Sequence, residues 1–129
     1  MDAFKTHGAF SWSELMTSDP KAASEFYAKL FGWTVKTMDM GQGQGPYHVL
    51  NLGESGIGGI MGKPPGVPAD MPPSWGCYVT VKSVEETLAQ AKSLGGKLCM
   101  GPMDIEGVGR MAVIQDPQGA VLNIIAYKM

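Results

Sequence analysis

The sequence between residues 14 and 33 reads ELMTSDPKAASEFYAKLFGW, and the sequence between residues 78 and 97 reads YVTVKSVEETLAQAKSLGGK. The second stretch lies 64 positions after the first, and each begins with an apolar run typical of a strand. Asp19 and Ser83 occupy equivalent places, and both suit a helix N-cap. Apolar residues then recur at helical spacing in both stretches. The two stretches therefore predict one strand–helix unit that occurs twice.

The residues at the ends of each helix predict where it starts and stops. Pro20 suits the first helical position, and Ser83 with Glu86 forms a capping-box pattern. Gly32 and Gly96 fall near the place of a helix-ending glycine. The apolar stripe of the first helix comprises Ala22, Ala23, Phe26, Tyr27 and Leu30, and that of the second comprises Val84, Leu88, Ala91 and Leu94.

The same 64-residue shift aligns the strands that follow each helix. A short strand is expected after each helix, followed by two further strands. In the second half, the turn residues Asp116-Pro117-Gln118-Gly119 join these two further strands. The aligned strand segments are 33–38 with 97–100, 47–50 with 111–114, and 57–60 with 121–124. The sequence therefore predicts an α+β fold of two tandem βαβββ modules.

The predicted modules are residues 7–62 and 75–127, joined by a linker over residues 62–74 that contains five prolines. One module is too small to bury its own sheet face. We therefore expect the two to form a single domain over residues 1–129, with curved mixed sheets enclosing a cleft. Whether the modules pair within one chain or between two chains stays open.

Composition argues against several classes of partner. A net charge of −2 is not the basic footprint of a nucleic-acid-binding protein, and no apolar run approaches the ~20 residues of a membrane span. The N-terminus lacks the apolar segment of a secretory signal, and two cysteines make no disulfide framework. We expect a cytoplasmic protein. The segment at residues 41–45, GQGQG, has no following helix or Lys-Ser/Thr pair and is interpreted as a flexible hairpin connection able to act as a lid.

Several motifs resemble the glyoxalase/bleomycin resistance/dioxygenase superfamily, also called the vicinal oxygen chelate (VOC) superfamily. They are WSEL at 12–15, SDP at 18–20, FY at 26–27 with LFGW at 30–33, GRMA at 109–112 and DPQG at 116–119. The resemblance covers about residues 7–127 and is closest to the hydroxylase-like, lactoylglutathione-lyase-related branch. It implies a fold rather than a reaction, because one scaffold hosts many chemistries.

The resemblance also implies where a metal ion would be held. In metal-using relatives, the first and last strands of each module supply His, Glu or Gln ligands. The equivalent positions here are Trp12, Gly59, Gly76 and Asn123. Zinc, nickel and iron prefer imidazole, thiolate or carboxylate donors, which these residues lack, and a shift by one residue supplies no better set. We therefore expect no cofactor and no divalent metal.

Glu14 is the candidate catalytic residue. It follows Trp12 by two positions and precedes Met16 by two, so the three side chains share one strand face. Burial among such neighbours would raise the pKa of the Glu14 carboxyl towards values useful for a general acid or base, and the carboxylate could also bind a cationic group. Alternatively, this strand edge is exposed to solvent, or Arg110 or a hydroxyl group pairs with the Glu14 carboxylate.

The other candidates are expected to line a ligand site. The aromatic residues Trp12, Tyr47, Trp75 and Tyr78 could stack on a flat ligand, with methionines adapting to it, although core packing is the alternative for each. His48 has the parity of Leu50 and is interpreted as a core or pocket histidine. Arg110 either clamps an anionic group or is a solvated loop residue. The predicted ligand-binding residues are Trp12, Glu14, Met16, His48, Met61, Trp75, Tyr78, Thr80, Arg110 and Asn123.

Three functions remain open at this stage. The favoured one is metal-independent binding of a small planar or oxygenated molecule, as in the sequestering bleomycin-resistance relatives. The second is a metal-independent lyase, isomerase or oxygenase that uses Glu14 as acid or base. The third is a divalent-metal glyoxalase or dioxygenase with a ligand set such as Glu14 and His48. We also expect a two-fold homodimer, because half-open sheets leave strand edges and apolar rims to be covered.

Overall fold

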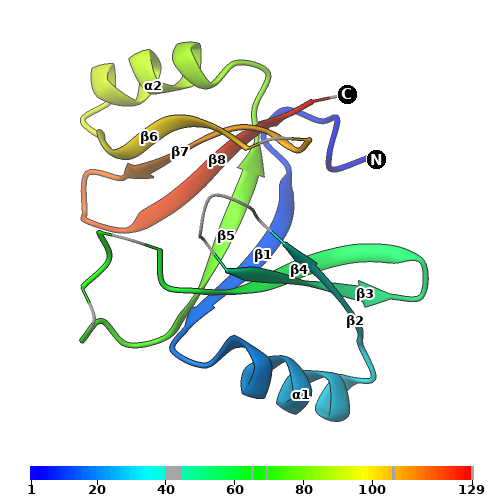
Figure 1. The fold of residues 1–129 in the computed structure, drawn as a ribbon. Coiled ribbons are helices and arrows are strands. Elements are labelled where there is room, and N and C mark those ends of the chain that lie inside the picture. The colour runs from blue at the N-terminus through cyan, green and yellow to red at the C-terminus, as the bar shows by residue number, and fades with distance from the viewer. Residues whose placement is uncertain (40–44, 65, 69, 106, 129) are drawn as a thin grey trace. The chain divides into compact units, whose positions relative to one another are not determined.

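The computed structural model describes residues 1–39, 45–64, 66–68, 70–105 and 107–128. Its elements follow the order strand, helix and three strands twice (Figure 1). The first set comprises β1 (Phe10–Thr17), α1 (Pro20–Phe31), β2 (Thr34–Asp39), β3 (Pro46–Leu52) and β4 (Ser55–Gly62). The second comprises β5 (Ser74–Thr80), α2 (Val84–Ser93), β6 (Lys97–Ile105), β7 (Gly109–Gln115) and β8 (Val121–Tyr127). The predicted α+β fold with tandem βαβββ modules is confirmed.

The chain divides into two compact units. The first unit is Trp12–Gly76, and the second unit consists of Met1–Ser11 with Cys77–Met129. The strand order is β2-β3-β4-β1 in the first unit and β5-β8-β7-β6 in the second. In each unit the first and last strands pair in parallel, and the other neighbours are antiparallel.

The strand register repeats with the sequence. Leu15 lies opposite Ile60 in the first unit, and Val79 lies opposite Ile124 in the second. Each residue of the second pair follows its counterpart by 64 positions. The two units therefore share their pairing register as well as their order of elements.

Each helix begins where its capping residue predicts. The Asp19 side chain accepts a hydrogen bond from the backbone N–H of Ala22 at the start of α1, and the Ser83 side chain accepts one from the N–H of Glu86 at the start of α2. Gly32 ends α1 in the left-handed conformation, with φ of 76°, which a residue without a Cβ adopts at little cost.

The end of α2 differs from the prediction. The left-handed residue is Gly95, with φ of 93°, and not Gly96. The helix itself stops at Ser93. Gly96 instead makes a close backbone approach, because a Cβ there would lie 2.9 Å from the carbonyl oxygen of Gln115.

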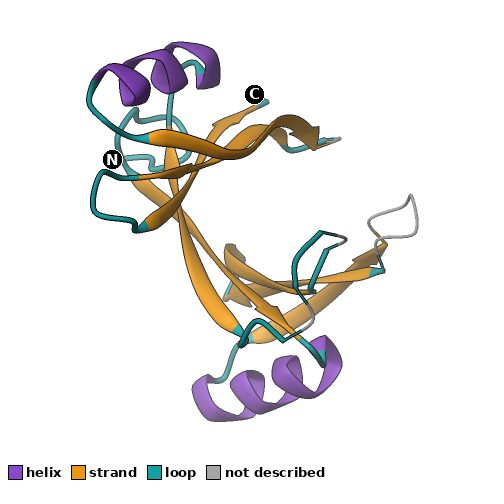
Figure 2. Ribbon diagram, turned by 90° about the vertical axis from the view of Figure 1, so that its left-hand side faces the viewer, coloured by secondary structure: helices purple, strands orange, loops and turns teal. Residues whose placement is uncertain are grey.

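The core of each unit lies between its helix and one face of its strands (Figure 2). In the first unit Leu15, Leu50 and Ile60 are buried and pack with Ala23 and Tyr27 of α1. In the second unit the buried cluster is Val81, Val84, Leu88, Ala112 and Ile124. Because successive side chains of a strand point to opposite faces, burial of these residues leaves the alternate ones on the face away from the helix.

The predicted apolar stripes are only partly buried. Phe26 and Leu30 of α1 are 59% and 58% exposed, and Leu94 after α2 is 70% exposed. The buried side of α1 is centred on Ser24, with Ala23 and Tyr27 beside it. Phe26 lies about 100° around the helix from Tyr27, so it points away from the sheet. Helical spacing therefore identified the apolar residues of each helix but not which of them are buried.

Two further sequence expectations concern the loops and the membrane. Residues 41–44 of the predicted lid lie outside the described residues. Neither helix in the described part of the chain has the length and hydropathy needed to cross a membrane.

The equivalent core residues Ile60 and Ile124 provide a test of the fold. Both are almost fully buried, with 0% and 2% exposure, so Ile60→Ala and Ile124→Ala should each lower the free energy of unfolding by about 2–5 kcal/mol. Urea denaturation followed by circular dichroism measures the change. Val121→Ala, at a position 61% exposed in β8, is the control and should cost less than about 0.5 kcal/mol. Equal effects at positions 121 and 124 would contradict the assignment of the β8 faces.

Candidate functional site

Three side chains of the first unit form a chain of hydrogen bonds. The indole Nε1 of Trp12 donates to the hydroxyl of Tyr47 at 2.9 Å, and that hydroxyl donates to Oε2 of Glu14 at 2.6 Å. The indole N–H can only donate, so the phenol proton is directed at the carboxylate. The short O–H···O distance is typical of a hydrogen bond to an ionised acceptor.

These side chains lie on the strand face opposite α1. Trp12 and Glu14 alternate along β1 with the core residue Leu15, and Tyr47 alternates along β3 with Leu50. The side chains of Trp12, Glu14 and Tyr47 are all half-buried. We call this side of the first unit, away from α1, the open face.

Gly59 makes room for the phenol of Tyr47. A Cβ built on Gly59 would overlap the Tyr47 hydroxyl oxygen and the ring carbon that bears it. Gly59 pairs with Glu14 on one side and with Val49 on the other. Tyr47 therefore reaches diagonally over Gly59 to Glu14, and any side chain at position 59 would block that path.

Methionines flank the hydrogen-bonded group. Successive strands place Met38, Tyr47, Met61 and Met16 in one row across the sheet. Met16 and Met61 are half-buried, and Met38 is 49% exposed. Flexible thioether side chains can fit flat or irregular ligands and make favourable contacts with aromatic rings. The open face thus combines a carboxylate and a phenol with an adaptable apolar surface.

The structure brings Trp12, Glu14, Met16 and Met61 together and places two other predicted site residues elsewhere in this unit. His48 is only 7% exposed and lies on the α1 side with Leu50. Its Nδ1 is hydrogen bonded to the hydroxyl of Thr37 at 2.8 Å, and its Nε2 has no partner among the described residues. Trp75 donates from Nε1 to the Tyr27 hydroxyl at 3.2 Å and packs edge-on against that ring.

Three predicted residues lie in the second unit, on the strand face away from α2. Tyr78 pairs with Asn123 and donates to the sulfur of Met111 at 3.9 Å. The Thr80 hydroxyl donates to the carbonyl oxygen of Ala3 at 2.7 Å. Backbone hydrogen bonds also join Thr80 to Gly8 and Ala9, so Thr80 anchors the N-terminal segment.

Arg110 lies on the α2 side of its strand and is engaged by two carboxylates. Its guanidinium is 2.7 Å from Glu85 and 3.1 Å from Asp104. The hydrogen bond from Arg110 lowers the pKa of the Glu85 carboxyl, and the hydrogen bonds to Glu85 and then Asp104 raise the pKa of Arg110. Arg110 would have to leave both partners to clamp an anionic ligand.

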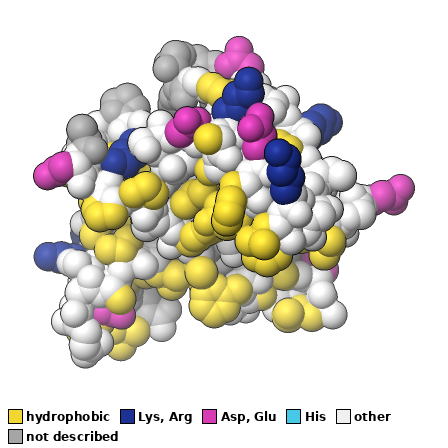
Figure 3. Space-filling model, turned by 90° about the horizontal axis from the view of Figure 1, so that it is seen from below, with side chains coloured by type: hydrophobic (Ala, Val, Ile, Leu, Met, Phe, Trp, Pro, Cys, Tyr) yellow, Lys and Arg dark blue, Asp and Glu magenta, His cyan; other side chains and the backbone are white. Residues whose placement is uncertain are grey.

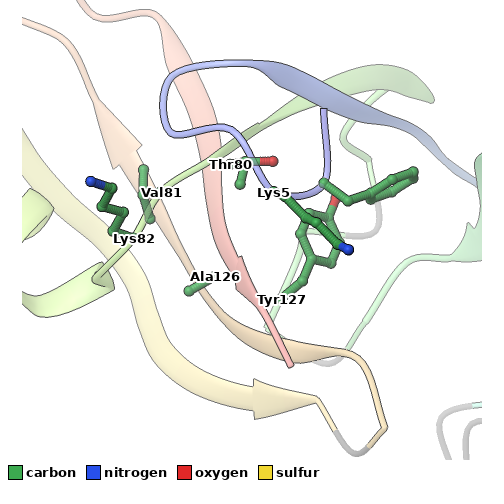
Figure 4. Close-up of a pocket in the computed structure, with 7 residues that line it drawn as sticks. Lys5, Thr80, Val81, Lys82, Ala126 and Tyr127 are labelled. Carbon is green, nitrogen blue, oxygen red and sulfur yellow. The ribbon is translucent and has the colours of Figure 1, made fainter. Parts of the chain in front are cut away.

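A pocket of about 210 Å³ opens in the second unit beside the N-terminal segment (Figure 4). Burial raises the pKa of the Tyr127 phenol there, although a hydrogen bond with Ser11 at 2.7 Å opposes the shift. Of the predicted site residues, only Thr80 reaches this pocket. The lining residues are Phe4, Lys5, Thr80, Val81, Lys82, Ala126 and Tyr127.

Comparison with known proteins settles the family. The sequence model described as the Glyoxalase/Bleomycin resistance protein/Dioxygenase superfamily matches residues 9–124. The chain belongs to this superfamily. The match spans both βαβββ units and confirms the resemblance seen in the motifs.

Two curated relatives share moderate sequence identity with the chain. The chain is 40% identical over 119 residues to a Mycobacterium tuberculosis protein named "Putative glyoxylase CFP32". It is 31% identical over 128 residues to the anthracycline biosynthesis protein DnrV of Streptomyces peucetius. These alignments cover 92% and 91% of this chain but only 44% and 46% of the relatives. The chain therefore spans about half the length of the curated relatives that it matches.

Solved structures share the fold at low sequence identity. Methylmalonyl-CoA epimerase from Mycobacterium tuberculosis superposes with a TM-score of 0.72 at 15% identity, covering 95% of this chain and 89% of that one. A hypothetical protein from Bacillus halodurans C-125 gives 0.71 at 16% identity, covering 96% and 97%.

The residues at the superfamily's metal-ligand positions carry no imidazole, thiolate or carboxylate. Trp12 at the first-strand position donates an indole N–H, and Gly59 at the last-strand position has its side-chain space filled by Tyr47. Gly76 has no side chain, and Asn123 offers an amide. Across the described residues, no three His, Cys, Asp or Glu side chains gather closely enough to hold a metal. Glu14 and His48, the alternative ligand pair, lie on opposite faces of the strands.

Tyr47 is the residue whose role sequence reasoning missed. It was a stacking candidate, but its hydroxyl joins Trp12 to Glu14. The available signal was the Gly58-Gly59 pair in a strand, because glycine within a strand often marks the close approach of another group.

Gly59→Ala tests the packing of Tyr47. The added methyl group cannot coexist with the phenol, so the variant should lose about 1–3 kcal/mol of stability and shift the Trp12 indole N–H resonance in NMR spectra. In a Tyr47→Ala background the same change should cost much less. Gly62→Ala is the control, since its Cβ would meet only Pro20 at an ordinary 3.7 Å. An equal cost of Gly59→Ala with and without Tyr47 would show that the phenol does not fill this space.

Proposed function

We propose that the chain binds a small, planar, partly oxygenated organic molecule on the open face of the first unit, without a metal ion. The observation that carries the proposal is the Trp12–Tyr47–Glu14 hydrogen-bond chain. Trp12 stands at the first-strand ligand position of metal-using relatives, and Tyr47 fills the side-chain space at the last-strand position, Gly59. A carboxylate held by a phenol is a recognition group in its own right and needs no ion to orient it.

The chemistry of the open face defines the ligand class. The Glu14 carboxylate has about four lone-pair positions, and the Tyr47 hydroxyl donates to one of its oxygens. A carboxylate accepts hydrogen bonds from the hydroxyl or amino groups of ligands. The row of methionines favours contact with a flat ring through its polarizable sulfurs. A phenol, an aromatic amine or a larger polycyclic compound with such groups meets both conditions.

Binding measurements with matched variants test this proposal. Thermal-shift screening of hydroxylated and aminated aromatic compounds, with anthracyclines included because of the name of the DnrV relative, should find a stabilising ligand. Titration calorimetry should then show that Glu14→Gln weakens its binding by about 10- to 100-fold, because a hydrogen bond to a charged group is lost. Tyr47→Phe should weaken it less. Glu54→Gln, in the exposed β3–β4 turn, should leave it unchanged.

Metal analysis and ligand screening can each contradict the proposal of metal-independent ligand binding. A stoichiometric divalent ion in protein purified without chelator would overturn the metal-independent assignment. Failure of every compound class to stabilise the protein would count against ligand binding, and unchanged affinity in Glu14→Gln would remove the open face as its location.

A metal-independent enzyme is the second candidate, and the 2.6 Å contact between Tyr47 and Glu14 favours it. An ionised Glu14 could accept a proton from a carbon next to a substrate carbonyl, leaving the electron pair in an enolate. Return of that proton to the opposite face of the carbon would give the epimer, which is an isomerisation. The Tyr47 hydroxyl would hold the carboxylate in place during both steps. Several solved structures with this fold are titled methylmalonyl-CoA epimerase, and an epimerase is an isomerase.

Hydrogen exchange distinguishes catalysis from binding alone. Methylmalonyl-CoA and a set of α-hydroxycarbonyl compounds would be incubated with the protein in D₂O and followed by proton NMR. An enzyme of this kind should accelerate deuterium incorporation, Glu14→Gln should abolish the acceleration, and Tyr47→Phe should shift its pH profile. Glu54→Gln should retain the full rate. Acceleration that survives in Glu14→Gln would exclude Glu14 as the base.

A further inference from the structure

Helix α1 and the residues beside it carry a group of large apolar side chains that the fold leaves accessible. We call this group the aromatic patch, and it consists of Phe26, Tyr27, Leu30, Phe31, Trp33 and Trp75. Phe26, Leu30 and Phe31 are 55–59% exposed and Trp75 is 42% exposed. All six residues belong to the first unit.

The aromatic patch is continuous. Tyr27 stands at its centre and contacts Phe26 edge-on at 5.0 Å between ring centroids and Trp75 edge-on at 5.2 Å. Phe31 and Trp33 complete it, with their centroids 4.9 Å apart. Figure 3, a view from the side on which Figure 1 shows α1, has hydrophobic side chains gathered together, with charged side chains beside them.

The size of the patch matches the apolar centre of a protein interface. Its exposed side chains present roughly 500 Å² of apolar surface, since large aromatic side chains have about 150–250 Å² each. A standard interface buries about 800 Å² on each partner, of which about 60% is apolar. Aromatic residues are also the ones that such interfaces favour at their centres.

Charges beside the patch are self-complementary. Glu25 and Lys29 are exposed on α1 one turn apart. A two-fold axis perpendicular to a helix places the two copies antiparallel and repeats every contact twice. With α1 aligned antiparallel around residue 27, Glu25 lies beside the partner's Lys29, and Lys29 lies beside the partner's Glu25.

We propose that a second copy of this chain covers the aromatic patch, with α1 packed against α1 of the partner subunit. Phe26 and Leu30 form the centre of the contact, and the two Glu25–Lys29 pairs form its rim. The alignments to curated relatives cover only 44–46% of those proteins, so each relative has room for a second segment of this size. This proposal does not depend on the ligand, because the open face lies on the opposite side of the same strands.

Sedimentation equilibrium of the full chain between 1 and 100 µM tests the proposal, with the internal repeat supplying a matched control. Wild-type protein should be a dimer of twice 13.7 kDa. Leu30→Glu should raise the dimer dissociation constant by at least about 30-fold, as expected for a buried interface anchor. Leu94→Glu makes the same change at the equivalent exposed position of the second unit and should leave the dimer intact. Circular dichroism melting curves verify that both variants fold.

Charge exchange then tests the orientation. Glu25→Lys alone and Lys29→Glu alone should each weaken the dimer, since each places like charges together at both rims. The double variant Glu25→Lys with Lys29→Glu should restore it. A wild-type monomer at 100 µM, or a dimer that Leu30→Glu leaves unaffected, would overturn the proposal. Failure of the double variant to recover would overturn the antiparallel α1 arrangement.

Discussion

Burial of one strand face beneath a single helix is the constraint on which each βαβββ unit depends. In the first unit Leu15, Leu50 and Ile60 are covered by α1, and in the second unit Ile124 and Ala112 are covered by α2. A slip of one residue in strand pairing would move these side chains to the other face and expose them. Burial therefore fixes the register, and the register fixes which residues lie on the strand face away from the helix.

The open face of the first unit can hold polar groups because these groups form hydrogen bonds with one another. The carboxylate of Glu14 accepts the Tyr47 hydroxyl, which in turn accepts the Trp12 indole N–H. Without these contacts, burial of the carboxylate would be costly. The glycine at position 59 makes the arrangement possible, since its missing side chain is the space in which the phenol lies. Gly59 therefore allows both the close packing of the strands and the hydrogen bond between Tyr47 and Glu14 on the open face.

The two proposed roles fall on opposite sides of the first unit. The α1 side carries the aromatic patch, and the other side carries Glu14 and the methionines. A partner chain on α1 would not compete with a ligand on the open face. The two proposals can therefore be tested independently by substitution, at Leu30 for assembly and at Glu14 for ligand recognition.

The sequence by itself determined the duplication, the order of elements, the capping of both helices and the shared strand face of Trp12 and Glu14. These features are local or periodic, so spacing along the chain is enough to specify them. Only the tertiary structure decided that His48 lies on the helix side, that Trp75 packs on Tyr27, and that Arg110 is engaged by Glu85 and Asp104. It also decided that Phe26 and Leu30 stay exposed and that Tyr47 crosses diagonally over Gly59. Periodicity shows which residues share a face, but the face that a helix covers and the reach of a side chain between strands depend on three-dimensional packing.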